Sequence, residues 1–255
     1  MSDYKISGKP YSVLRYPRIL HFFSVSKADG FWQRWQAHFG AAEFAQFRAV
    51  MEQPLPKVIR VNTLRNSVAE FLAWARHRHP DWQLTPHPFG EGIFGIERAD
   101  RSVPLGNTLG HAQGRFYIQE AASCLPPLAL AVQPGEAVLD LAAAPGSKTT
   151  QLAAQMQGRG LLVANELVTA RTKKLVFNLL RCGVPNALVT GLDGVRFGEA
   201  LPETFDAILL DAPCSGEGTY RKDREALQHW SLARIEEMAF LQEQLLAAAW
   251  QALRP

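Results

Sequence analysis

The chain has 255 residues, of which 47% are hydrophobic and 20% charged, and its formal net charge at pH 7 is +3. This balance excludes a disordered chain, a collagen and a coiled coil, and the length suits one large domain or two small ones. No apolar run approaches the roughly 18 residues of a membrane helix, and residues 1–10 lead into no apolar segment, so we expect neither a membrane span nor a signal peptide. The three cysteines, Cys124, Cys182 and Cys214, are too few and too scattered for a disulfide framework or a four-ligand zinc site. We therefore expect a cytoplasmic protein without a metal centre.

The charge is distributed unevenly along the chain. Residues 1–110 carry a formal charge of +5 and five of the seven histidines, whereas residues 111–255 carry −2. A mildly basic first part fits contact with a polyanion. An ordinary solvated surface can carry the same charge, so the charge alone leaves both interpretations open.

The first 110 residues predict a small domain of mixed secondary structure. Aromatic residues near helical spacing predict one helix over residues 31–51 with a buried face. Alternating polar and apolar residues predict a strand over 57–62. Residues 80–110 are rich in Gly, Pro and His, which indicates loops and short strands. We expect residues 1–110 to form a small α+β domain.

A helix start is predicted between these segments. Asn66 or Ser67 can cap a helix that follows, and Glu70 is placed for a capping box with Ser67. The pair His79 and Pro80 should end this helix, because proline disfavours helical backbone in the residue before it.

Residues 111–255 predict a different architecture. Short apolar strands alternate with helices, which indicates a parallel sheet with crossover helices, and ligands of such sheets bind beyond the carboxyl ends of the strands. The predicted elements are strands over 137–141, 160–164, 187–190 and 205–210, and helices over 148–157, 169–182 and, capped by Ser231, 231–253.

The turn after the first of these strands has the composition of a ligand-binding loop. Its small residues let the backbone approach a ligand, and the helix that begins near Lys148 directs free N–H groups and its positive dipole end at a carboxylate or phosphate. The residues of this turn are Ala142, Ala143, Ala144, Pro145, Gly146, Ser147 and Lys148.

Acidic residues follow the other three strands. Glu166 can accept hydrogen bonds from both hydroxyls of a ribose, and Asp193 can accept from an adenine amino group. Asp211 follows the fourth strand. A P-loop is not matched because Lys148 follows a serine, and a G-x-G-x-x-G fingerprint is absent. A nucleoside that carries an amino acid, S-adenosylmethionine, therefore fits better than ATP or NAD.

Two motifs give a specific resemblance. The segments LDLAAAPGSKTT at 139–150 and DAPCSGEG at 211–218 resemble the RNA cytosine-C5 methyltransferase family, and the finer likeness is to its ribosomal RNA branch. The segments at 57–63 and 117–123 resemble its N-terminal domain and the lead into its catalytic domain. The resemblance implies a Rossmann-like methyltransferase sheet that binds S-adenosylmethionine through the turn residues, Glu166, Asp193 and Asp211, and an RNA partner.

The chemistry of cytosine C5 methylation gives a reason for a cysteine in the segment 211–218. A thiolate that adds to C6 makes C5 nucleophilic, so that C5 can take the methyl group before a base removes the C5 proton. From the residues alone, Cys214 is the candidate nucleophile, and Asp211 could hold the cytosine edge. The resemblance implies instead that a Thr-Cys cysteine on the next strand attacks and that the Pro-Cys cysteine helps product release.

The chain contains no Thr-Cys pair after Cys214. We therefore expect a fragment that keeps much of the cofactor pocket, lacks the later strands and leaves residues 207–210 as an unpaired sheet edge. The alternative function is a non-catalytic RNA-binding or assembly protein that retains the fold. Residues 221–224 (Arg-Lys-Asp-Arg) are a candidate phosphate contact, with an exposed charged turn as the alternative.

Overall fold

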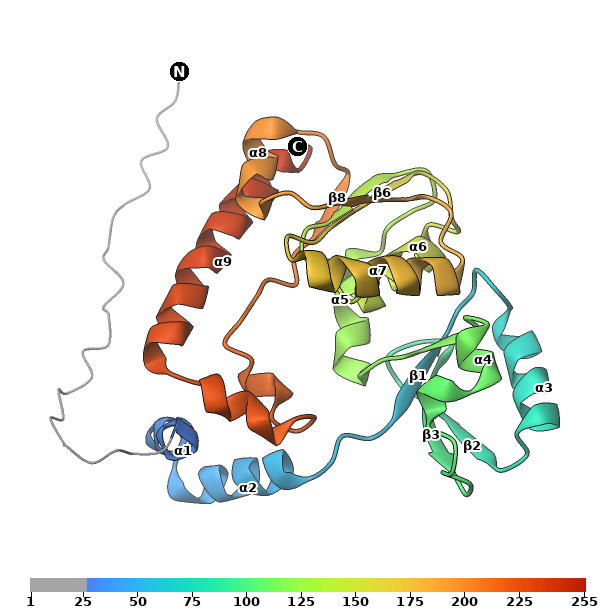
Figure 1. Cartoon of the computed structure of the whole chain (residues 1–255), viewed down its shortest axis with the longest axis horizontal. Coiled ribbons are helices and arrows are strands. Elements are labelled where there is room, and N and C mark those ends of the chain that lie inside the picture. The colour runs from blue at the N-terminus through green and yellow to red at the C-terminus, as the bar shows by residue number, and fades with distance from the viewer. Residues whose placement is uncertain (1–26) are drawn as a thin grey trace, which may run out of the picture.

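The structure is a computed structural model that describes residues 27–255 (Figure 1), so the polar start of the chain lies outside the described residues. A helical hairpin, an antiparallel sheet and a parallel sheet follow one another along the chain. In the described part, no helix is both long enough and apolar enough to span a membrane.

The hairpin consists of α1 (Lys27–His38) and α2 (Ala41–Glu52), so the prediction of one helix over 31–51 is wrong. The helices separate at Gly40, which is extended at the start of α2 with φ −65° and ψ 159°. Glycine destabilises a helix interior, which makes this a favourable place for the break. Phe31 is fully buried, and its cluster includes Tyr220 and Trp230, nearly 200 residues later in the chain.

The antiparallel sheet has the strand order β2-β3-β1-β4. Its β1 confirms the strand predicted over 57–62, and α3 packs on one face of the sheet through Phe71 and Ala75. Because β4 pairs with β1, the sheet includes residues on both sides of the division predicted at residue 110. The elements are β1 (Val58–Val61), α3 (Val68–Arg78), β2 (Trp82–Pro86), β3 (Ile93–Arg98), α4 (Leu109–Ala112) and β4 (Phe116–Ile118).

The predicted capping box starts α3. The Ser67 hydroxyl accepts a hydrogen bond from the Glu70 N–H at 3.2 Å, and the Glu70 carboxylate accepts one from the Ser67 N–H at 2.7 Å. The helix ends with His79 as its C-cap, as predicted.

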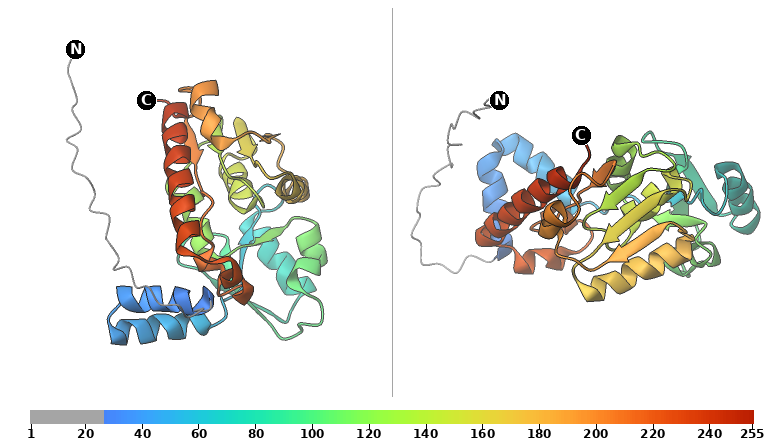
Figure 2. Two further views of the ribbon diagram at one scale, coloured as in Figure 1. Left: turned by 60° about the vertical axis from the view of Figure 1, so that its left-hand side comes forward. Right: turned by 90° about the horizontal axis from the view of Figure 1, so that it is seen from above.

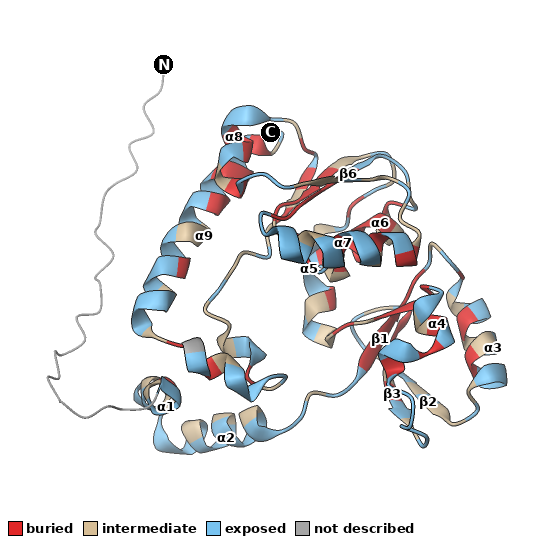
Figure 3. Cartoon of the chain, in the orientation of Figure 1, coloured by how far each residue is buried: buried red, intermediate tan, exposed pale blue. Residues whose placement is uncertain are grey.

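The parallel sheet has the order β7-β6-β5-β8, and all of its pairings are parallel. The predicted Rossmann-like alternation of strands and helices is confirmed. Apolar side chains of α5, α6 and α7 pack on one face of the sheet and those of α8 and α9 on the other. Figure 2 shows the ribbon of the sheet and helices from two further sides, and Figure 3 shows that the strands between them are buried. The elements are α5 (Leu125–Leu130), β5 (Ala137–Asp140), α6 (Ser147–Gln155), β6 (Leu161–Asn165), α7 (Thr169–Cys182), β7 (Ala187–Thr190), α8 (Phe197–Ala200), β8 (Ala207–Leu209) and α9 (Leu232–Ala252).

The strand β8 lies at the edge of the parallel sheet, as predicted. Just before it, Phe205 forms a parallel bridge with Leu253, and the Arg254 N–H donates to the Phe205 carbonyl at 2.9 Å. The residues after α9 therefore run alongside the start of this edge.

Candidate active site

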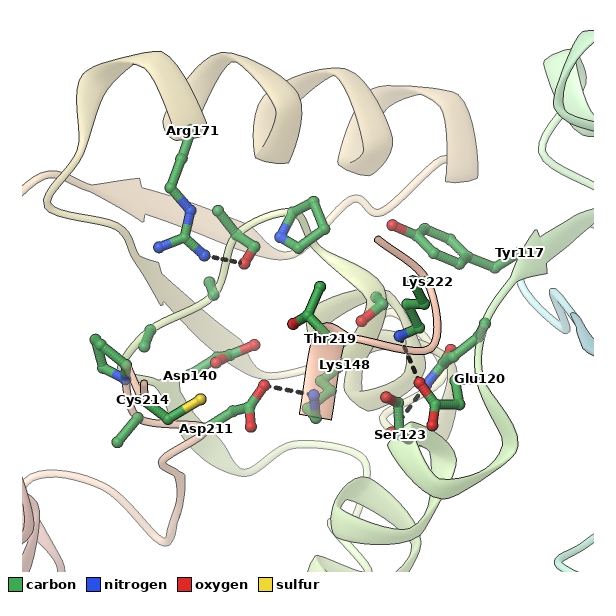
Figure 4. Close-up of a pocket in the computed structure, with 18 of the residues that line it drawn as sticks. Tyr117, Glu120, Ser123, Asp140, Lys148, Arg171, Asp211, Cys214, Thr219 and Lys222 are labelled. Carbon is green, nitrogen blue, oxygen red and sulfur yellow. Dashed lines mark hydrogen bonds and ion pairs between the residues drawn. The ribbon is translucent and has the colours of Figure 1, made fainter. Parts of the chain in front are cut away.

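A cavity of about 690 Å³ lies at the carboxyl ends of β5 and β8 (Figure 4). Its other wall comes from the end of β4 and the segment that follows it. The cavity brings together residues from widely separated parts of the chain. Those predicted from the sequence are Ala142, Ala143, Ala144, Pro145, Ser147, Lys148, Asp211 and Cys214.

The turn after β5 is closely packed against the sheet. The Ala143 N–H donates to the Asn165 carbonyl at 2.8 Å, which ties the turn to the end of β6. Gly146 does not line the cavity but starts α6 with φ +103°, a conformation that favours glycine. A Cβ at this position would lie 3.2 Å from a methyl carbon of Leu175, so both conformation and space favour glycine here.

Asp140 is a buried carboxyl group in the wall of this cavity. Its side chain is 1% exposed, and the Thr149 hydroxyl donates to its Oδ2 at 2.6 Å. Burial raises the pKa of Asp140 to about 7, against the opposing effect of the Thr149 hydrogen bond. Its Oδ1 has no hydrogen-bond partner among the described residues. A buried acceptor without a partner is costly, so this oxygen marks a place for a ligand donor.

Lys148 connects the ends of β5 and β8. Its Nζ donates to Asp211 Oδ2 at 2.5 Å, and the lysine is mostly buried while the aspartate is exposed. Cys214 lies three residues after Asp211 on the same wall and is exposed and free. Cys124 and Cys182 are buried, and burial raises the pKa of both thiols. Cys214 is thus the accessible thiol of this chain.

Two of the predicted acidic residues do not line the cavity. Glu166 is buried and caps the backbone N–H of Val168 at 2.9 Å, and its carboxylate lies 3.3 Å from Arg171, which does line the cavity. Asp193 is exposed and caps the N–H of Val195 at 3.2 Å. The structure therefore places Glu166 behind Arg171 and Asp193 outside the lining.

The opposite wall contains residues that the motif reasoning did not assign. Tyr117, Glu120 and Ser123 belong to the segment at 117–123, whose family resemblance was the available signal. Burial raises the pKa of Tyr117 to about 12. Glu120 pairs with Lys222, which joins this wall to the segment after Cys214 (Figure 4). No local sequence signal could have found that pair, because its members are far apart in the chain.

The segment after Cys214 is held by the helical hairpin. Arg34 of α1 lies 3.0 Å from Glu217, and the same carboxylate accepts a hydrogen bond from the Trp230 indole at 2.7 Å. Arg221 donates to the Gln53 carbonyl at 3.0 Å.

Arg224 donates to the Glu52 carbonyl at 3.1 Å and Lys222 pairs with Glu120, so the basic cluster at 221–224 is engaged within the protein. Lys222, Asp223 and Arg224 are exposed and residues 221–222 form a turn, which agrees with the exposed charged turn, whereas the phosphate contact stays a prediction.

Two family models match the chain. Residues 127–255 match the 16S rRNA methyltransferase RsmB/F model, and residues 28–121 match the model of the N-terminal domain of 16S rRNA methyltransferase RsmF. Ribosomal RNA small subunit methyltransferase F of Aeromonas hydrophila is 52% identical over 223 residues, which cover 86% of this chain and 46% of that protein. The chain spans about half the length of the curated relatives it matches.

Solved structures give the same result for the fold. A methyltransferase homologue from Pyrococcus horikoshii superposes with a TM-score of 0.70 at 36% identity, covering 81% of this chain and 64% of that one. NSun6 from Pyrococcus horikoshii, solved with SFG, superposes with a TM-score of 0.75 over 88% of this chain and 79% of that one, and its 21% identity supports the fold alone. With the two family models covering both of its sheets, the chain belongs to the RsmB/F family of 16S rRNA methyltransferases.

Proposed function

We propose that this chain is the cofactor-binding and RNA-facing part of an enzyme that methylates C5 of cytosine in ribosomal RNA. The observation that carries the proposal is one cavity lined both by residues of the Ala142–Lys148 turn, after β5, and by the accessible thiol of Cys214, after β8. The family relationship supports the RNA substrate, which would place the activity in the cytoplasm.

The cavity suits S-adenosylmethionine. Its amino acid part carries an ammonium and a carboxylate. The unpartnered, buried Oδ1 of Asp140 offers an acceptor for an ammonium, and the start of α6 offers N–H donors for a carboxylate. The cofactor would supply an activated methyl group. We propose that the turn residues and Asp211 hold it directly. Glu166 and Asp193 would contribute after a local rearrangement of their side chains, or through lining neighbours such as Arg171.

The protein's own groups would carry out the covalent part of the reaction. The Cys214 thiolate can add to cytosine C6, and once a base has taken the C5 proton, breaking of the C6–S bond returns the thiolate. We propose that Asp211, which the Lys148 ammonium holds at the cavity, accepts a hydrogen bond from the cytosine edge. The target base must leave its stack to reach this site.

The antiparallel sheet and the hairpin are the proposed RNA-contacting accessory region. Residues 1–110 carry a formal charge of +5, of which residues 27–110 carry +2; this positive charge supports the assignment, because phosphate contacts supply much of the affinity for nucleic acids. The proposed division into residues 1–110 and 111–255 leaves β4 on the second side, although it pairs with β1.

The proposal is tested with RNA that contains 5-fluorocytosine, because the fluorine blocks proton removal and traps the thiol adduct. The chain is incubated with S-adenosylmethionine and this RNA, and adducts are resolved on a denaturing gel. We expect an adduct in the unchanged chain and none in Cys214→Ser, with Cys182→Ser as the control that keeps it.

A chain that binds the cofactor and RNA but forms no adduct would contradict a nucleophilic Cys214. That result would favour the second candidate, a non-catalytic RNA-binding protein.

A further inference from the structure

Arg60 is a buried cation behind the candidate active site. Its neighbours on β1, Ile59 and Val61, pack in the core with α3, so the alternation of the strand directs Arg60 toward α6. The side chain is 5% exposed. Its Nη2 donates to Thr150 Oγ1 at 2.9 Å and to the Ser147 carbonyl at 3.4 Å, both in the first turn of α6.

The same guanidinium also contacts the opposite wall. Its Nε donates to Gln119 Oε1 at 3.1 Å, and the Gln119 amide donates to the Ser123 carbonyl at 3.0 Å. Gln119, Ser123 and Ser147 all line the cavity, whereas Arg60 does not. One side chain thus joins the two walls from behind, where it cannot touch a ligand.

Burying the charge of Arg60 costs free energy. Each of its hydrogen-bond acceptors is neutral: an amide oxygen, a hydroxyl and a backbone carbonyl. A buried guanidinium with neutral partners is costly, so the position is better explained by the geometry it imposes than by net stabilisation. Hydrogen bonds from a charged donor are stronger than neutral ones, which suits a fixed bridge.

We propose that Arg60 is a positioning residue that fixes the Ala142–Lys148 turn against the Gln119 wall, and that cofactor affinity depends on this bridge. This inference rests on the proposed function, since it assigns a residue of the antiparallel sheet to the cofactor site of the parallel sheet. It makes the antiparallel sheet part of the cofactor site as well as a surface for RNA.

Calorimetric titration of the whole chain with S-adenosylhomocysteine tests the proposal. In Arg60→Met we expect the Kd to rise about tenfold, with a stoichiometry unchanged from the parent chain. A variant that merely unfolds in part would show a reduced stoichiometry with an unchanged Kd. Arg60→Lys should have an intermediate Kd, because an ammonium cannot span the same acceptors. Thr150→Val removes one acceptor and should raise the Kd a few-fold.

Asn62→Leu is the matched control. Asn62 directly follows β1, two residues after Arg60, and its amide donates to the carbonyls of Gly114 and Cys182, both at 2.8 Å. It too connects β1 to the parallel-sheet part, but at the end of α7, and neither acceptor residue lines the cavity. We expect a lower unfolding temperature in this control with a Kd within about twofold of the parent value.

Two results would overturn the proposal: a parent-like Kd in Arg60→Met, or an equal rise of the Kd in Asn62→Leu. If Arg60→Met does not fold, parent-like Kd values in both Arg60→Lys and Thr150→Val would overturn it. Failure of the parent chain to bind S-adenosylhomocysteine would contradict the proposed function, and this inference with it. Normal parental binding with an unaffected Arg60→Met would contradict this inference alone.

Discussion

The Ala142–Lys148 turn and the segment 211–222 face the same cavity, but different kinds of contact hold them there. The turn continues from buried β5, bonds to the end of β6 through the Ala143 N–H, and is braced from behind by Arg60. The segment 211–222 leaves an edge strand and is positioned by ion pairs to distant parts of the chain, Lys222 to Glu120 and Arg34 to Glu217.

The site must hold a small ligand firmly and must also admit a large substrate, and the two segments suit these different requirements. Burial and backbone hydrogen bonds give the turn one arrangement, which suits a small ligand that is always the same. Partly exposed ion pairs contribute little stability and are easily exchanged, which suits a wall that must admit a large substrate. We therefore expect substitutions in the turn to change the global stability of the protein and substitutions that affect the segment 211–222 to change how often this segment opens.

The largest expected effect comes from Asp140, the buried carboxyl group at the end of β5, just before the turn. Because the pKa of Asp140 is raised to about 7, the folded state keeps a proton that the unfolded state loses near pH 4. Its contribution to stability is therefore fully present below pH 4 and is lost as the pH rises to 7. Asp140→Asn has no ionisable group here and does not lose this contribution. Between pH 4 and pH 7, the free energy of unfolding of Asp140→Asn minus that of the parent chain should therefore increase by up to about 1.4 kcal/mol per pH unit.

Urea unfolding of both proteins at several pH values from 4 to 8 measures the effect. Thr149→Val is the comparison, since it removes a hydrogen bond that favours the charged carboxylate and should extend the pH-dependent loss to higher pH. A free-energy difference between parent and Asp140→Asn that does not vary with pH would show that this wall is less buried in solution.

Two glycines sharpen the comparison between the walls. Gly146 of the turn and Gly216 of the other wall both have positive φ, at +103° and +80°. A Cβ on Gly216 would meet nothing within 4 Å, whereas one on Gly146 would crowd Leu175. Gly216→Ala should cost about 1 kcal/mol through backbone strain alone, and Gly146→Ala about 1 kcal/mol more. Thermal unfolding measures both, and equal costs would contradict the tighter packing of the turn.

The sequence predicted what depends on neighbouring residues. The capping box of Ser67 and Glu70 and the turn after β5 are local patterns, and both were found from the residues alone. The break at Gly40 was missed because the aromatic spacing continues across it. Arg60 could not be assigned, since Gln119 and Thr150 come next to it only when the two sheets pack together. Glu166 and Asp193 follow strands as predicted, but each accepts a local capping bond and neither lines the cavity.

The smallest expected effect concerns the contact between the hairpin and the second wall. Arg34→Ala leaves Glu217 bonded to the Trp230 indole alone, so residues 216–230 should open more often while the rest of the fold is unchanged. A partly exposed ion pair contributes at most about 1 kcal/mol, so amide exchange in this segment should accelerate about fivefold. Hydrogen exchange followed by mass spectrometry measures this change.

Glu52→Gln is the control for this change, because it removes an exposed ion pair with Arg48 on the same hairpin and should leave exchange in residues 216–230 unaltered. Exchange that accelerates equally in β5 and α6 of the Arg34→Ala chain would mean that the two walls open together. Their different construction would then have no consequence for how the cavity admits a substrate. Acceleration limited to residues 216–230 would instead assign the hairpin the role of holding the wall that carries Cys214.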